Sequence, residues 1–191
     1  MLIENNLTGG IILSKDYGFD TLSIHGSRKH KNPMGALNPP IFMTSTFEFD
    51  DVKDAEAIMN FEKQGFIYTR GNNPTLKLFE QRMSELEEGE DAVAFASGMG
   101  AISSVLLSLL SPGNNVVVHK TLYGSSFTVT HKLLPKYHIT CKNADFTKPE
   151  TIEEAIDDST KVLYFETPAN PNLEIIDMEQ VVKLANAKGV K

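Results

Sequence analysis

A run of small residues, Ser97-Gly98-Met99-Gly100-Ala101, separates an apolar stretch from a helical pattern. Unpaired backbone amides in the first turn of a helix, aided by the helix dipole, bind phosphate and other anions. A tight strand-to-helix turn that needs glycine for its backbone angles would have the same residues. Gly98 and Met99 are therefore candidate phosphate-binding residues, and a purely structural turn stays open.

Two more segments that follow predicted strands carry side chains suited to binding a flat ring. Tyr123 can stack on such a ring with its hydroxyl left for proton transfer, or it can pack in the core. Asn170 stands between Pro168 and Pro171, in a loop that these prolines stiffen. Its amide can orient a ligand, although asparagine before proline is also common in turns.

An arginine upstream of these segments is a further candidate. Arg70, in the segment from Tyr68 to Pro74, presents parallel N–H groups that match two phosphate oxygens. A solvated surface arginine is the alternative interpretation. The segment itself does not decide between them.

Several other chemistries have little support. The five histidines show no metal-ligand spacing and Cys141 is the one cysteine, so we expect no metal site. The sequence contains neither Gly-x-Ser-x-Gly nor GxxxxGK followed by Ser or Thr. A dinucleotide fingerprint would need glycine at Ser103 and an acidic residue at His119 or Lys120, which disfavours NAD and leaves NADP open.

Strands and helices alternate along the second part of the chain. We predict strands over residues 92–96, 116–119, 139–142 and 162–165, and helices over 74–88, 101–110, 126–136, 152–156 and 178–187. Thr147 and Glu150 have the spacing of a capping box, while Asp177 and Gly189 suit the two ends of the last helix. The alternation predicts the α/β class: an open, mostly parallel sheet with helices on both faces. Ligands of such sheets bind at the carboxyl ends of the strands.

The chain divides into two parts by pattern. Residues 1–60 have little periodicity and several prolines, which predicts an extended N-terminal arm, and residues 61–191 form the α/β domain. A further strand is expected to begin at Val190-Lys191, so the predicted sheet is incomplete.

The composition of the chain indicates which partners and which cellular compartment to expect. The chain has 191 residues, with 18 Lys and Arg against 25 Asp and Glu, a net charge of -7 that disfavours nucleic acid. It lacks an apolar run long enough to span a membrane, so we expect no membrane partner. A single cysteine fits a reducing compartment, and we expect the protein in the cytoplasm.

Four segments follow one another in an order and spacing that cover nearly the whole chain. They are Tyr68-Thr69-Arg70 with Asn73-Pro74-Thr75, Ser97-Gly98-Met99-Gly100-Ala101, Leu122-Tyr123-Gly124, and Glu166-Thr167-Pro168-Ala169-Asn170-Pro171. Together they resemble the cysteine/methionine metabolism family of pyridoxal-phosphate (PLP) enzymes. Residues 35–40 and 44–47 look most like its methionine γ-lyase branch. The resemblance implies a truncated large domain of a fold type I PLP-dependent transferase, with an incomplete PLP-binding domain over residues 61–191.

The resemblance also assigns roles around the cofactor phosphate. Gly98 and Met99 would donate backbone amides to it, and Tyr68 and Arg70 would reach the phosphate held by a neighbouring subunit. An active dimer is then the minimum unit, and the family forms dimers of such dimers. The protein is thus expected to be a homo-oligomer, a homotetramer in the family.

For the ring, the resemblance implies that Tyr123 stacks on it and helps a thiol leave, while Asn170 hydrogen-bonds its phenolic oxygen. The implied reaction is γ-elimination of a thiol from a sulfur amino acid, giving a 2-oxo acid and ammonia. Ser125 stands where methionine γ-lyases usually have cysteine. The family's cofactor-attaching lysine lies past residue 191, so the chain is expected to be inactive by itself. Lys161, in Ser159-Thr160-Lys161, imitates that lysine but lies at the wrong edge of the sheet.

Other functions stay open. Within the same family these are a cystathionine γ-lyase and an O-acetylhomoserine sulfhydrylase. In other classes they are an NADP- or phosphate-binding module, which the Gly98 turn and Lys120 would serve, and a non-enzymatic remnant that dimerises through its arm.

Overall fold

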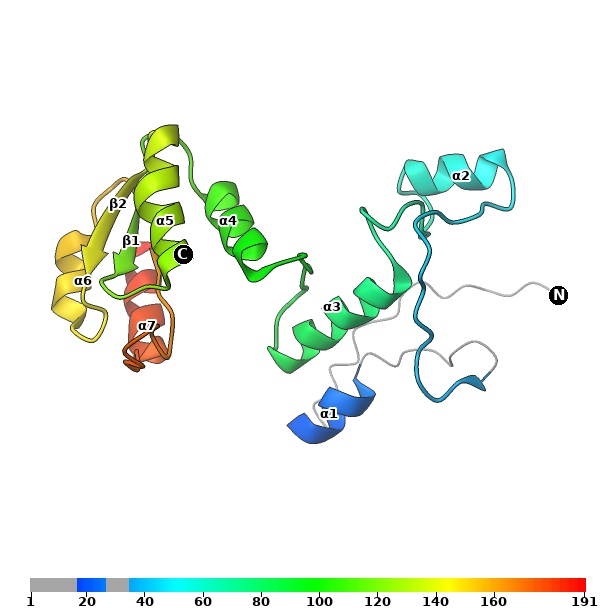
Figure 1. Ribbon diagram of the computed structural model, residues 1–191, viewed down its shortest axis with the longest axis horizontal. Helices are drawn as coiled ribbons and strands as arrows, with labels where there is room; N and C mark the ends of the chain where they lie inside the picture. Colours follow the sequence, from blue (N-terminus) through cyan, green and yellow to red (C-terminus); the bar gives the residue numbers. More distant parts are fainter. Residues whose placement is uncertain (1–16, 27–34) are drawn as a thin grey trace. The chain divides into compact units, whose positions relative to one another are not determined.

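The computed structural model describes residues 17–26 and 35–191. The chain forms two compact units, which divide between Ala94 and Phe95 (Figure 1). No helix in the described ranges is both long enough and apolar enough to cross a membrane.

The first unit contains the helices α1 (Phe19–His25), α2 (Val52–Met59) and α3 (Pro74–Leu86). Arg82 of α3 donates from Nη2 to the carbonyl of Gly26 at 2.7 Å, and this bond holds the end of α1 against α3. Residues 45–47 and 67–69 pair as a short antiparallel bridge. Since α1 and α2 lie in residues 1–60, part of the predicted extended arm is helical. The domain boundary near residue 60 stays a prediction.

The predicted strand over residues 92–96 is wrong for this structure. Nothing in the described part of the chain pairs with it, and Val93 is 72% exposed. The segment contains the junction of the two units, and its Ala94 amide donates to Glu80 Oε1 at 2.9 Å instead of to a neighbouring strand. An apolar run predicts burial but cannot supply the hydrogen-bond partner that a strand needs.

The second unit is an α/β layer structure, as the alternation predicted. Its strands β1 (Asn115–His119), β2 (Thr140–Ala144) and β3 (Thr160–Tyr164) form a parallel sheet in the order β2-β1-β3. The observed strands begin and end within two residues of the predicted ones. The central strand β1 is buried along its whole length.

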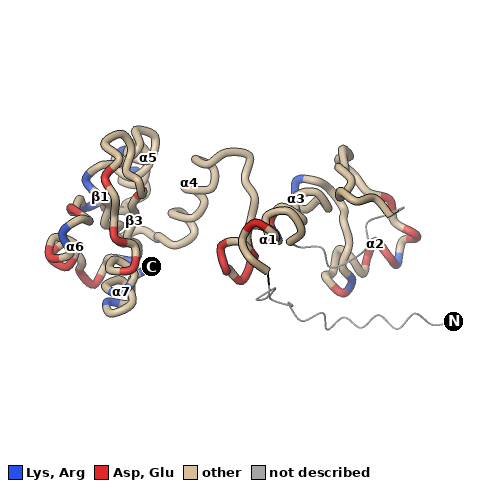
Figure 2. The backbone as a smooth tube through the Cα atoms, turned by 90° about the horizontal axis from the view of Figure 1, so that it is seen from below, with Lys and Arg blue, Asp and Glu red and all other residues tan. Residues whose placement is uncertain are grey.

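Helical segments precede, connect and follow these strands. They are α4 (Gly98–Leu109), α5 (Gly124–Thr128), the π-helix η2 (Val129–Leu133), the 3-10 helix η3 (Leu134–Tyr137), α6 (Pro149–Ala155) and α7 (Met178–Lys188). The predicted helix over 126–136 is thus three consecutive helical turns of different pitch. In α4 no residue is charged, and Figure 2 shows it tan throughout.

The predicted caps are confirmed for α7 and are wrong for α6. Asp177 accepts a hydrogen bond from the Gln180 amide at 3.1 Å, and Gly189 is left-handed with φ 66, which confirms both ends of α7. The capping box at Thr147 is wrong, because α6 begins after Lys148. The Thr147 hydroxyl instead donates to Asp145 at 2.6 Å, since the turn after β2 offers a nearer acceptor.

Alternating side chains of the sheet form two apolar layers. Val117 faces a cluster with Ile152 of α6 and Val181 of α7. Val116 and Val118 face the opposite cluster, with Leu106 of α4 and Leu134 of η3. The period-two alternation of a strand therefore lets one valine run support both faces. In Figure 1, α5 and α6 lie on opposite sides of β1 and β2.

Residue 191 lies beside β3. The Lys191 amide donates to the Lys161 carbonyl at 3.0 Å, and the Leu163 amide donates to the Lys191 carbonyl at 2.8 Å. These are the slanted bonds of a parallel ladder. The backbone at Val190-Lys191 therefore takes the position expected of a strand that begins there.

A polar network closes the amino-terminal edge of the sheet. Asn115, which is buried, donates from Nδ2 to Asp157 at 2.8 Å and to the Ser159 hydroxyl at 2.7 Å, and it accepts from Thr160 at 2.8 Å. Hydrogen bonds from Lys142, then from Ser159 and Asn115, hold the pKa of Asp157 well below its usual range.

At the carboxyl edge, an ion pair joins the segments that follow β1 and β2. Lys120 Nζ lies 2.7 Å from Asp145 Oδ2. Hydrogen bonds from Lys120, and next from Thr147, lower the pKa of Asp145 to about 2.

Replacing Asn115 by alanine should lower the free energy of unfolding by about 2 kcal/mol, because buried polar groups lose their partners. Urea unfolding of the chain measures this change. Asn186→Ala, at an exposed position of α7, is the matched control and should change stability by less than about 0.5 kcal/mol. An equal effect of both substitutions would contradict the structural role of Asn115.

Asp145 should make stability depend on pH in the acid range. Its folded-state pKa of about 2 lies below the unfolded value near 3.9, so its contribution is complete above about pH 5 and is lost as the pH falls toward 2. Unfolding free energies measured between pH 5 and 2 should therefore fall less steeply in Asp145→Asn than in the unsubstituted chain. Lys120→Met should flatten the same part of the curve, and an unchanged slope in both variants would refute this assignment.

Candidate functional site

The segments after β1 and β3 meet at the carboxyl edge of the sheet. The Tyr123 amide, which follows β1, donates to Glu166 Oε2 at 2.8 Å, and Glu166 follows β3. The Tyr164 hydroxyl donates to Glu166 Oε1 at 3.1 Å. Glu166 therefore holds the Tyr123 backbone against the end of β3. Burial raises the pKa of Tyr164, which keeps its hydroxyl protonated as a donor.

Tyr123 stands at the start of α5 with its side chain half exposed. The tight contact to Glu166 fixes its backbone, while the ring is not part of either apolar cluster. The alternative of a core-packing tyrosine is therefore not supported. A fixed backbone with an accessible ring suits stacking on a planar ligand.

Gly98 and Met99 form the first turn of α4. The Ser97 side chain caps the helix by accepting from the Gly100 amide at 3.0 Å. Among the described residues, no acceptor is bonded to the amides of Gly98 and Met99. A Cβ built at Gly98 would meet nothing within 4 Å, so the turn is not crowded at that residue. The turn thus fits an anion such as a phosphate group.

The first turns of α4 belong to the same side of the sheet as the Tyr123 segment. Ile102 of α4 packs against the same apolar cluster as Leu122 and Tyr164. Leu122 precedes Tyr123, and Tyr164 ends β3. The helix α4 and the segment that leads to Tyr123 therefore pack on the same apolar cluster.

Asn170 lies exposed in a loop with several internal hydrogen bonds. The Ala169 amide donates to the Glu174 carbonyl at 2.8 Å, and the Leu173 amide donates to the Ala169 carbonyl at 2.7 Å. The Ile176 amide donates to the Thr167 hydroxyl at 3.1 Å. The loop is therefore built on the buried Ala169, and it presents the adjacent Asn170 amide at its surface.

Tyr68 and Arg70 lie in the first unit. The Arg70 guanidinium carbon is 5.0 Å from the centroid of the Tyr68 ring, a cation–π contact. Tyr68 also takes part in the antiparallel bridge with Thr46, and its side chain is 43% exposed. The structure therefore brings these two predicted residues together on a paired backbone segment.

His119 is a residue of this edge whose contacts sequence reasoning did not predict. It is wholly buried at the end of β1, its Nδ1 accepts from the Phe146 amide at 3.0 Å, and its Nε2 lies 3.2 Å from Glu174 Oε2. Its position at a strand's carboxyl end was the available signal. No residue spacing pointed to Glu174 as its partner.

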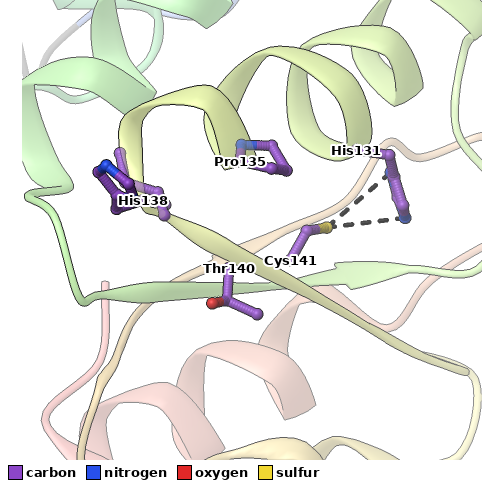
Figure 3. Close-up of a pocket in the computed structure, with 6 residues that line it drawn as sticks. His131, Pro135, His138, Thr140 and Cys141 are labelled. Carbon is purple, nitrogen blue, oxygen red and sulfur yellow. Dashed lines mark hydrogen bonds between the residues drawn. The ribbon is translucent and has the colours of Figure 1, made fainter.

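A pocket of about 420 Å³ lies elsewhere, beside the edge strand β2 and the helices η2 and η3 (Figure 3). Cys141 Sγ is 3.7 Å from His131 Nε2 in this pocket. Burial raises the pKa of Cys141 to about 11, so the thiol stays protonated and is a poor nucleophile. The pocket lining comes from the amino-terminal half of β2 and not from the carboxyl edge, so we do not place the chemistry there. Its lining residues are His131, Pro135, His138, Ile139, Thr140 and Cys141.

Comparisons with known proteins identify the family of the chain. Residues 20–191 match the family described as Cys/Met metabolism PLP-dependent enzyme. The L-methionine gamma-lyases of Pseudomonas deceptionensis and Fusobacterium nucleatum subsp. polymorphum are 42% and 44% identical, over 90% and 91% of this chain. The O-succinylhomoserine sulfhydrylase of Pseudomonas aeruginosa is 34% identical over 90% of it. The chain spans 43%, 44% and 42% of the length of these relatives.

Solved structures show the same fold. A putative O-acetylhomoserine (thiol)-lyase from Campylobacter jejuni, solved with N'-pyridoxyl-lysine-5'-monophosphate, superposes with a TM-score of 0.84 at 29% identity, over 91% of this chain and 43% of that one. The metB protein of Corynebacterium glutamicum superposes with a TM-score of 0.82 at 31% identity, over 92% and 44%. The chain belongs to the Cys/Met metabolism family of PLP-dependent enzymes.

Proposed function

We propose that this chain supplies the phosphate- and ring-contacting part of a PLP-dependent carbon–sulfur lyase of the methionine γ-lyase type. The observation that carries the proposal is the pair of unpaired amides at Gly98 and Met99, on a helix that packs on the same apolar cluster as the segment leading to the fixed Tyr123 backbone. The similarity to L-methionine gamma-lyases supports the branch, and the sulfur amino acid class of substrate follows from it.

The proposed phosphate contacts use backbone groups. The Gly98 and Met99 amides would each donate to a phosphate oxygen, and the α4 dipole would add to the attraction. Ser97 already accepts from the Gly100 amide, so the turn needs no rearrangement to present these donors. Arg70, aligned on the Tyr68 ring, would serve with Tyr68 as a second set of phosphate contacts, in a neighbouring subunit. This arrangement requires a homo-oligomer.

The proposed ring contacts use Tyr123 and Asn170. Tyr123 would stack on the pyridine ring, and its hydroxyl would hold a proton near the departing thiol. Asn170 would donate its amide to the ring's phenolic oxygen. The cofactor, when bound, supplies an electron-withdrawing ring, and the protein orients the substrate against it.

Lys161 is not proposed as the attachment point of the cofactor. It is the second residue of β3, at the amino-terminal end of the strand, and its Nζ donates to the Asp158 carbonyl at 3.1 Å. Tyr123 and Asn170, the residues proposed to contact the ring, follow the carboxyl ends of β1 and β3, at the opposite edge of the sheet.

A replacement reaction is the alternative within the family. The O-succinylhomoserine sulfhydrylase and the homocysteine synthase of Schizosaccharomyces pombe are 34% and 32% identical to this chain. Elimination is preferred because the lyases are more similar, at 42% and 44% identity. The cytoplasm is the proposed location, since Cys141 is a free cysteine.

Replacing Gly98 by proline should weaken binding of inorganic phosphate and of PLP about fivefold, because one donor is lost. Ser97 is extended and Gly98 is the first helical residue, where proline is well tolerated, so α4 should remain folded. Isothermal titration calorimetry with each probe measures the two affinities.

Two controls separate the lost donor from other effects. Gly98→Ala keeps the amide and should bind both probes as the unsubstituted chain does. Met178→Pro makes the same change at the first residue of α7 and should leave binding unaltered. Unchanged phosphate affinity in Gly98→Pro would count against this turn as the phosphate site.

Mixing the chain with PLP and reducing with borohydride should give no stoichiometric label on any one lysine. The reason is that no lysine of the chain is assigned to hold the cofactor, and Lys161 is engaged at the opposite edge. Peptide mapping by mass spectrometry measures the labelled sites. One lysine labelled to completion would overturn this expectation.

A further inference from the structure

His119 links three segments at the carboxyl edge. It ends β1, its Nδ1 accepts from the Phe146 amide after β2, and its Nε2 lies 3.2 Å from Glu174 Oε2 after β3. Because Nδ1 is an acceptor, the ring hydrogen is on Nε2, which donates to Glu174. His119 is 0% exposed, so water does not replace either bond.

Glu174 connects His119 to the loop that carries Asn170. Its carbonyl accepts from the Ala169 amide at 2.8 Å, while its side chain accepts from His119 and, at 3.2 Å, from Asn172. One residue therefore anchors the loop by its backbone and ties it to β1 by its carboxylate. Lys120 Nζ, 3.7 Å from Glu174 Oε1, adds a weaker and more exposed contact.

We propose that His119 is a positioning residue, which sets the Asn170 loop against the Tyr123 segment through its hydrogen bond to Glu174. The inference rests on the proposed function for the role of Asn170. The bond to Phe146 orients the imidazole, and the bond to Glu174 transmits that orientation to the loop. His119 itself is buried and touches no ligand.

Two substitutions of His119 each remove one of its two hydrogen bonds and keep the other. In His119→Gln, the amide nitrogen can take the place of Nε2 and donate to Glu174, whereas the acceptor for Phe146 is lost. In His119→Asn, the amide oxygen can take the place of Nδ1 and accept from Phe146, whereas the donor to Glu174 is lost. Each variant thus keeps one bond and removes the other.

Affinities for two probes, measured by calorimetry on the whole chain, form the first test. His119→Asn should bind PLP about fivefold more weakly and inorganic phosphate unchanged, because only the ring contact depends on the loop. His119→Gln should bind both probes as the unsubstituted chain does. Equal losses in both variants, or a loss of phosphate affinity in His119→Asn, would indicate a merely structural role and overturn the proposal.

Amide hydrogen exchange without any ligand forms the second test. His119→Asn should speed exchange of the Ala169 and Leu173 amides, while His119→Gln should speed exchange of the Phe146 amide. If the unsubstituted chain binds no PLP, the proposed function fails, yet this pattern still supports positioning. Equal exchange at Ala169 in the two variants overturns it.

Substitutions of Glu174, the acceptor in the hydrogen bond from His119, test the proposal if His119→Asn does not fold. Glu174→Ala removes the same acceptor at a position whose side chain is 27% exposed, and Glu174→Gln retains an acceptor there. Glu174→Ala should reproduce the loss of PLP affinity and the faster exchange at Ala169, and Glu174→Gln should restore both toward the original values. Failure of Glu174→Ala to change either quantity would refute the proposal.

Discussion

The central strand β1 has to be buried on both faces and paired on both sides, and the second unit is organised around this constraint. Its middle is Val116, Val117 and Val118, all 0% exposed, which support apolar layers above and below. Its ends are Asn115 and His119, which are buried polar residues. Burial of polar groups is unfavourable unless they are hydrogen-bonded, and the polar residue at each end of β1 forms hydrogen bonds to several partners.

The hydrogen-bond networks of Asn115 and His119 differ in the segments that they join. Around Asn115 the partners are short turns at the amino-terminal edge, and the network there stabilises the start of the strands. Around His119 the partners are Phe146, in the turn after β2, and Glu174, in the loop that carries Asn170. The same requirement, that a buried polar group be satisfied, therefore produces a structural edge and an edge suited to ligand binding.

The strands, the helix end at Gly189 and the class of fold were predictable because they depend on local pattern. The lack of a strand at residues 92–96 was not predictable, because a strand also needs a neighbouring strand to pair with. The failure of Thr147 to cap α6 was not predictable either, because Asp145 competes for its hydroxyl. Gly98, Met99 and Tyr123 were identified as candidates from residue type and position. The contacts of His119 could not be predicted, since Phe146 and Glu174 are 27 and 55 residues away along the chain and only the folded sheet brings them together.

The strand order β2-β1-β3 determines where a crevice can form. The chain leaves β1 for β2 through α5, η2 and η3, and then returns through α6 to the other side of β1. These two connections cover opposite faces of the sheet, since Leu134 and Ile152 belong to different apolar clusters. The order in which strands are added to the sheet therefore reverses at β1. After the segments at Tyr123 and Glu166 meet, the chain continues to η2 on one face of the sheet and to α7 on the other. Such a topological switch point is where open α/β sheets admit their ligands, and here Tyr123 and Asn170 stand on its two sides.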